Sequence, residues 1–145
     1  MAQIVTDEGL DWLLGQWPRA ASVQAGSCYI GLFTSQTAST VVARGGTMSA
    51  CITEPTTGSY ARLVIASSAW GAPATSGLGR KTTGPQVTFA TATSNWGTIN
   101  GFFLTASATG NTVLIYQANF DDLTGVVINT NDIIKGTPAF QLSAS

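Results

Sequence analysis

The sequence predicts an all-β fold, namely a single antiparallel β-sandwich or jelly roll of about eight strands with a short N-terminal helix. Charged residues make up only 9% of the 145 residues and hydrophobic residues 44%, whereas about 25% of an average globular chain is charged. Short apolar runs recur between small polar turns, as in β proteins. Residues 98–120 have the pattern of an antiparallel hairpin. The length suits one domain, residues 1–145.

Residues 1–18 are predicted to form the N-terminal helix or arm. Thr6 supplies a helix N-cap, the acidic residues after it suit the positive end of a helix, and Pro18 ends the helix. Between them lies one apolar stripe with i, i+3, i+4, i+7 spacing, formed by Leu10, Leu13, Leu14 and Trp17. We expect this stripe to dock on the sheet. The alternative is an arm that docks on a neighbouring subunit.

Further strands are predicted where apolar and β-branched runs lie between turn residues. In order, they are Cys28–Thr34, Thr47–Thr53, Tyr60–Ala66, Val87–Ala90, Val126–Ile128, Ile133–Lys135 and Ala139–Leu142. Residues 67–85 are rich in Gly, Ser, Thr and Pro and are predicted to be a long loop. Long loops in compact domains are often functional or interfacial, so this segment is a candidate for contacts.

The hairpin at 98–120 has apolar residues on both faces of its strands. In the first strand, Phe103 falls on one side, and Phe102 and Leu104 fall on the other. Antiparallel sheets usually leave one face to water. A hairpin with two apolar faces needs two covers. We expect the domain itself to supply one cover and a neighbouring subunit to supply the other.

The available residue types argue against an enzyme. The chain has no histidine, which is the most common general base and metal ligand. Cys28 and Cys51 are too few for a structural zinc site; two thiols are expected, with a disulfide as the alternative. Asp121 and Asp122 are adjacent, so a solvated turn explains them better than a glycosidase pair. We expect no catalytic residue, cofactor or metal.

Charge and hydropathy also limit the partners. A net charge of −1 gives no basic patch for nucleic acid. No apolar run reaches the roughly 18 residues of a membrane helix, and the acidic start lacks the basic region of a signal peptide. A surface so poor in charge suits a protein held in an assembly. We therefore expect a homo-oligomer, a trimer or a dimer, with no nucleic acid and no membrane.

Two charged residues lie in apolar surroundings. Arg62 lies within the strand YARLVIA, and Glu54 precedes the turn that leads into that strand. A half-buried arginine needs a partner, so Glu54 and Arg62 are a candidate structural ion pair. The alternative is an edge-strand arginine whose charged end reaches water.

Large apolar side chains are the candidates for an assembly interface. They are Leu10, Leu13, Trp17, Trp70, Trp96, Phe102, Phe103 and Tyr116. Four aromatic residues could instead form a sugar-binding platform, and these are Tyr29, Tyr60, Trp70 and Trp96. Packing in the core and at interfaces explains aromatic residues more often, so a glycan is not the partner that we expect.

The order of the segments resembles that of a known group of proteins. The sequence YIGLFT is followed by a Glu, by GSYAR with an apolar strand, by a Gly/Thr-rich loop, and then by QVTFATATSNWGTINGFFL, a TGN turn and VLIY. Small bacteriophage virion structural proteins, of tail-fibre-like or capsid cement type, have similar segments in this order, over residues 6–142. The chain departs from their pattern at Ser107 and Asn111, which affects only turn geometry. The resemblance implies a β-sandwich that assembles into the particle.

Together these features predict a non-enzymatic structural protein of a phage particle, made in the cytoplasm of the host bacterium and found in the virion. Within this class we expect a capsid cement or decoration protein that contacts the major capsid protein, because the compact chain has no fibrous shaft. The alternative is a tail, baseplate or fibre component that contacts tail proteins, with a receptor- or glycan-binding role.

Overall fold

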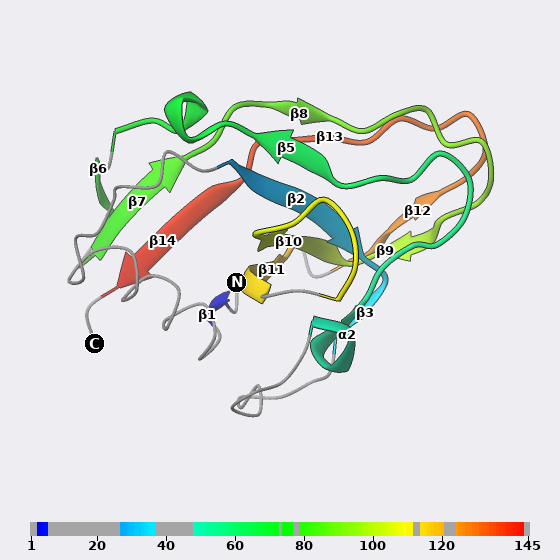
Figure 1. Ribbon diagram of the computed structural model, residues 1–145, viewed down its shortest axis with the longest axis horizontal. Coiled ribbons are helices and arrows are strands. Elements are labelled where there is room, and N and C mark those ends of the chain that lie inside the picture. Colours follow the sequence, from blue (N-terminus) through cyan, green and yellow to red (C-terminus); the bar gives the residue numbers. More distant parts are fainter. Residues whose placement is uncertain are drawn as a thin grey trace.

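The computed structural model describes residues 3–5, 27–36, 48–72, 74–76, 79–111, 114–120 and 124–143. These residues form an all-β arrangement of antiparallel strands, as predicted (Figure 1). The helix expected within residues 1–18 lies outside the described residues, except that Gln3–Val5 is a strand.

The elements have the following bounds. In chain order they are β1 (Gln3–Val5), β2 (Cys28–Phe33), β3 (Ser35–Gln36), α2 (Met48–Cys51), β4 (Ile52–Thr53), β5 (Leu63–Ile65), the 3₁₀ helix η1 (Ser67–Ala69), β6 (Ala74–Ser76), β7 (Gly79–Thr83), β8 (Val87–Thr88), β9 (Gly97–Ile99), β10 (Gly101–Thr105), β11 (Leu114–Asn119), β12 (Val126–Ile128), β13 (Lys135–Gly136) and β14 (Ala139–Ser143).

The central sheet has the strand order β1-β11-β10-β2-β5, with every pair antiparallel. The predicted hairpin is its middle: Phe103 in β10 lies opposite Gln117 in β11, and the register shifts between Leu104 and Thr105. On the other side of β10, Phe103 lies opposite Gly31 of β2. The hairpin is therefore an interior pair of strands, flanked on each side by another strand.

A long antiparallel ribbon forms most of the remaining fold. Its first leg, residues 79–99, runs antiparallel to its second leg, residues 126–143. Three strand pairs hold the legs together, namely β7 with β14, β8 with β13 and β9 with β12. Backbone hydrogen bonds continue the pairing between these strands, from Gly84 N–H to the Pro138 carbonyl at 2.8 Å, from Phe89 N–H to the Ile134 carbonyl at 3.0 Å, and from Trp96 N–H to the Ile128 carbonyl at 3.0 Å.

The ribbon arches over the central sheet. Figure 1 shows it passing from β7 and β14 on the left, through β8 and β13 at the top, to β9 and β12 on the right. There β9 leads into β10 through Asn100, whose N–H donates to the Phe33 carbonyl at 2.9 Å. Gly101 pairs with Asn119 but Ile99 pairs with Val126. The segment formed by β9 and β10 therefore pairs with β11 along β10 and with β12 along β9.

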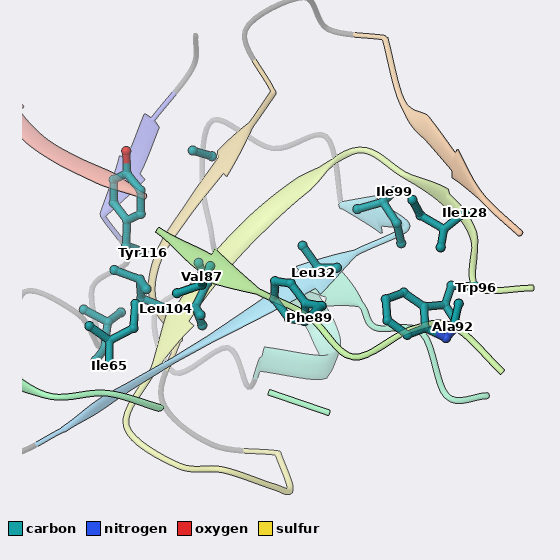
Figure 2. Close-up of a cluster of buried hydrophobic side chains, with 13 residues drawn as sticks. Leu32, Ile65, Val87, Phe89, Ala92, Trp96, Ile99, Leu104, Tyr116 and Ile128 are labelled. Carbon is teal, nitrogen blue, oxygen red and sulfur yellow. The ribbon is translucent and has the colours of Figure 1, made fainter. Parts of the chain in front are cut away.

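The main hydrophobic core fills the space between the ribbon and one face of the central sheet. Figure 2 shows this cluster, with Trp96 and Ile128 at one end and Ile65 and Tyr116 at the other. Its buried residues are Ile30, Leu32, Ile65, Val87, Phe89, Ala92, Trp96, Ile99, Leu104, Ile115, Tyr116, Ala118 and Ile128. In β2, alternation places Ile30 and Leu32 on this face. In β11 the register shift leaves Ile115 as an extra residue, and it joins its neighbour Tyr116 in the cluster.

The second face of the hairpin is covered by the chain itself, so the expected cover by a neighbouring subunit is wrong. A second buried cluster lies there and consists of Phe33, Met48, Cys51, Ile52, Phe103 and Leu114. Met48 and Cys51 belong to α2 and Ile52 to β4. The predicted strand Thr47–Thr53 is thus a helical turn followed by a short strand, and its apolar residues supply the cover.

Residues 67–85 are more regular than the predicted loop. They contain η1, β6 and β7, and β7 lies between β14 and β6 in a three-stranded sheet. The strands of this segment are rich in Thr, Ser and Gly, so they show no alternation of apolar and polar residues. Pairing with the second leg, which a reading of local sequence does not reveal, gives them their structure. The described sheets do not close into the predicted jelly roll.

Gly101→Ala is expected to lower the free energy of unfolding by about 1–3 kcal/mol, because overpacking forces the backbone apart. A methyl group at Gly101 would overlap the carbonyl oxygen of Ala118 and lie 2.6 Å from the ring of Phe33. Gly136→Ala is the control, since nothing lies within 4 Å of its added methyl. Urea denaturation of both variants measures the difference, and equal losses would contradict the close packing described.

Candidate functional site

Arg62 carries a buried guanidinium that binds two separate parts of the chain. Its side chain is 5% exposed. Nε donates to Glu54 Oε1 at 2.9 Å and Nη2 donates to Glu54 Oε2 at 2.6 Å, which makes a two-point ion pair. Nη1 donates to the Ser107 carbonyl at 3.0 Å and Nη2 to the Gly110 carbonyl at 2.8 Å. The structure thus confirms that Glu54 and Arg62 pair. It also shows that Arg62 binds the tip of the β10–β11 hairpin, which was not predicted.

Tyr60 joins this group through its hydroxyl. β5 pairs with β2 only as far as Ile30, and no other described strand pairs with the next part of that β2 edge. There the Leu32 N–H donates to the Tyr60 hydroxyl at 2.9 Å, and the hydroxyl donates to Glu54 Oε1 at 2.9 Å. Burial, followed by the negative charge of Glu54, raises the pKa of Tyr60 far above its usual range. The hydroxyl therefore stays protonated, and it accepts from the Leu32 N–H as the backbone of a neighbouring strand would.

We call Glu54, Tyr60, Arg62 and the hairpin tip, residues 107–111, the Arg62 network. The tip also holds α2, because the Ser49 N–H donates to Asn111 Oδ1 at 2.8 Å. Gly110 has a φ of +79°, a conformation that glycine adopts without strain. The tip is therefore fixed by Arg62 at two carbonyls and by α2 at its last residue.

An aromatic ring lies under the guanidinium. Arg62 Cζ lies 5.5 Å from the ring centroid of Phe103, within the range of a cation–π contact. The absence of a side chain at Gly31 makes room for this ring, since an added methyl would overlap Phe103 and lie 2.8 Å from the Tyr60 hydroxyl. The Arg62 network and the second apolar cluster are consequently packed against each other.

The candidates for an assembly interface occupy different places. Leu10, Leu13 and Trp17 lie outside the described residues. The side chains of three others are buried in the chain's own core, so they are not available to a partner, and these are Trp96, Phe103 and Tyr116. The remaining two, Trp70 and Phe102, are half-buried and pack against the main cluster.

The aromatic residues considered for a sugar platform also pack inward. Tyr60 makes an edge contact with Trp96, with 5.4 Å between ring centroids, and stacks on Phe89 at 6.3 Å. With Trp96 buried and the Tyr60 hydroxyl engaged at the β2 edge, the four residues offer no joint exposed surface.

Both cysteines are free thiols, so the alternative of a disulfide is wrong. Burial raises the pKa of the Cys28 thiol, and a hydrogen bond from Trp70 partly opposes this rise. A buried neutral thiol is a poor nucleophile and a poor metal ligand. Among the described residues, no group of three or more His, Cys, Asp or Glu side chains is arranged to hold a metal ion. No helix in this part of the chain has the length and hydropathy needed to cross a membrane.

The large apolar side chains that are most exposed are not among the residues predicted to form an interface. These are Val64, Val126, Val127 and Ile133. Three of the four belong to the second leg of the ribbon, on or near β12 and β13. The run GVVI, in which three apolar residues follow one another without a polar residue, is the signal in the sequence that could have marked part of this surface.

A comparison with protein-family models finds one that covers nearly the whole chain. The family described as Podophage GP4 fiber I protein gp80 matches residues 1–143. The chain belongs to this family. Searches of curated proteins and of solved structures find no match.

Membership of this fibre-protein family confirms the resemblance to phage virion structural proteins. It supports the tail-fibre alternative better than the expected capsid cement protein. It also agrees with a site made of structural contacts: the polar groups of the Arg62 network bind one another and the backbone of the chain.

Arg62→Met is expected to lower the free energy of unfolding by about 3–5 kcal/mol, because it leaves the Glu54 carboxylate without its buried partner. Arg62→Lys should lower the free energy of unfolding by a smaller amount. An ammonium keeps the charge, but it lacks the planar set of donors that binds a carboxylate and two carbonyls together. Denaturant titration measures these changes. Lys81→Met, which removes an exposed cation, is the matched control. Losses as small as those of the control would contradict the central place of Arg62.

Tyr116→Phe is expected to leave the stability unchanged or raise it by about 1–3 kcal/mol, because the buried hydroxyl has no hydrogen-bond partner among the described residues. The ring contact with Phe140, at 4.9 Å between centroids, is kept.

The same variant tests the alkaline stability. Burial raises the pKa of Tyr116 to about 12, above the value of about 10 in an unfolded chain. Stabilisation from the neutral phenol is complete below the unfolded pKa and is lost as the pH rises through the folded one. Urea titrations at increasing alkaline pH should show a smaller loss in Tyr116→Phe than in the wild type. Identical losses would show that Tyr116 is not protected in the core.

Proposed function

We propose that the chain is a structural component of the phage tail, of the fibre type, and that it acts through protein contacts without catalysis. The observation that carries this proposal is the match of residues 1–143 to a family described by a podophage fibre protein. The match covers the ribbon, the central sheet and the Arg62 network alike. Every element of the described fold therefore lies within the matched residues.

The expectation of a capsid role rested on compactness, because the chain has no fibrous shaft. Compactness describes a globular part of a fibre as well as a cement protein, so it does not favour the capsid over the tail. The apolar second face of the hairpin, which was expected to need a neighbouring subunit in either place, is covered by α2 and β4 of the same chain.

The chemistry of the described residues supports a non-enzymatic role. The side chain of Glu54, which is 18% exposed, uses both carboxylate oxygens on Arg62 and one of them on Tyr60. A carboxylate engaged in this way is not free to act as a general base. The polar groups that the fold gathers together therefore stabilise it.

The partners that this proposal implies are other virion proteins of the tail. With so few charged residues, long-range attraction contributes little to association. Contacts would depend on exposed apolar side chains and on backbone hydrogen bonds at strand edges. The exposed valines of β12 and the neighbouring Ile133 fit such contacts.

Gold-labelled antibodies against the chain are expected to mark the tails of intact particles, because a fibre component is attached there. Particles made without the chain should keep filled heads and lose fibre density in electron micrographs. A capsid cement protein predicts the opposite: gold over the whole head and heads that break more easily in its absence. That result would overturn the proposal.

A further inference from the structure

An Asn-Gly dipeptide lies at the junction between the ribbon and the central sheet. Asn100 and Gly101 form the only such pair in the sequence, and Gly101 is the first residue of β10. Asn-Gly is typical of two-residue hairpin turns, in which both residues have a positive φ. Neither residue has a positive φ here. Turn geometry therefore does not explain this pair.

Packing and hydrogen bonding explain it instead. A methyl group at Gly101 would overlap a carbonyl oxygen of β11 and lie 2.6 Å from the ring of Phe33, so a larger residue does not fit. The Asn100 N–H donates to the Phe33 carbonyl at 2.9 Å, and the Asn100 carbonyl accepts from the Phe120 N–H at 3.0 Å. The side-chain Nδ2 of Asn100 donates to the Thr34 carbonyl. Asn100 is thus fixed on both sides.

An asparagine followed by a glycine can lose its side-chain amide without an enzyme. The backbone nitrogen of Gly101 gives up its proton and forms a bond to Cγ of Asn100, and the side-chain nitrogen leaves as ammonia. Water then opens the resulting succinimide ring to aspartate or to isoaspartate. In isoaspartate the main chain passes through the side-chain carboxyl carbon and is longer by one atom. Glycine favours the attack because no side chain hinders its nitrogen.

We propose that Asn100 is a site of spontaneous deamidation that the folded structure protects and the unfolded chain does not. Ring closure requires the Asn100 side chain to leave the Thr34 carbonyl and turn onto the Gly101 nitrogen. In the fold, the backbone of Asn100 is held by hydrogen bonds to Phe33 and Phe120, so this movement needs a local opening of the structure. The unfolded chain has no such restraint.

The product of the reaction does not fit the place that Asn100 occupies. An ionised carboxylate accepts hydrogen bonds and donates none. Aspartate at this half-buried position would therefore leave the Thr34 carbonyl without its donor, which costs free energy. Isoaspartate would lengthen the main chain just before Gly101, where the packing leaves no room. A chain that stays unfolded for long thus loses its ability to fold, wherever the protein lies in the particle.

Peptide mass spectrometry of the purified full-length chain tests the site. Folded protein and protein held unfolded in guanidinium chloride are kept with a reductant at the same mildly alkaline pH. In the unfolded chain Asn100 should convert before Asn95, and Gly101→Ala should slow its conversion. In the folded chain Asn100 should convert at least about tenfold more slowly. Equal rates in the folded and unfolded chain, or an unfolded chain in which Asn95 converts as fast, would overturn the proposal.

Refolding tests the consequence. After increasing times in denaturant, the molecules that refold should contain intact Asn100, and those that fail to refold should contain the converted residue. Asn100→Asp should unfold at a lower denaturant concentration than the wild type or fail to fold. Asn95→Asp is the matched control, because Asn95 Oδ1 accepts from the Gly97 N–H at 2.6 Å and a carboxylate accepts equally well. Equal stability of the two variants, or full refolding of converted chains, would overturn the proposal.

Discussion

The arrangement at the edge of the central sheet depends on the hydrogen bonds of the Arg62 guanidinium. Arg62 lies just before β5, binds a carboxylate from the start of the preceding turn, and reaches two carbonyls at the tip of the β10–β11 hairpin. A buried arginine is tolerated only when its donors are matched, and here one side chain and two backbone groups match them. The tip of the hairpin, α2 and the turn before β5 are consequently held in one arrangement, although they are far apart in the sequence.

This arrangement explains how a chain with few charges covers a hairpin that is apolar on both sides. One face of the sheet lies under the ribbon, and the other lies under a short helical turn that the hairpin tip itself anchors through Asn111. Phe103 belongs to the second face and also contacts the guanidinium. Both apolar faces of the hairpin are thus covered within the chain.

Hydropathy and charge patterns in short segments predicted the hairpin and the ion pair, because both are determined by residues close together in the sequence. The β10–β11 hairpin follows from two apolar runs around a polar turn, and the pairing of Arg62 with Glu54 follows from a charge in an apolar strand. The strand β7 could not be predicted in this way, because its Thr- and Gly-rich sequence is ordered by pairing with β14, more than fifty residues later. The reach of Arg62 to Ser107 and Gly110 is likewise a tertiary contact. The exposure of the Ile133 side chain is likewise decided by tertiary packing, which hydropathy does not report.

The pairing of the two legs has a consequence for how the protein is made. Synthesis completes the first leg at Ile99, and the second leg follows from Val126 to Ser143. Until their partners at Ile134 and Val126 have been made, Phe89 and Ile99 of the first leg have no opposite strand. Contacts so distant in sequence slow folding and leave unpaired strands exposed for longer. A ribosome that stops before the second leg therefore releases a protein whose first leg has no antiparallel partner.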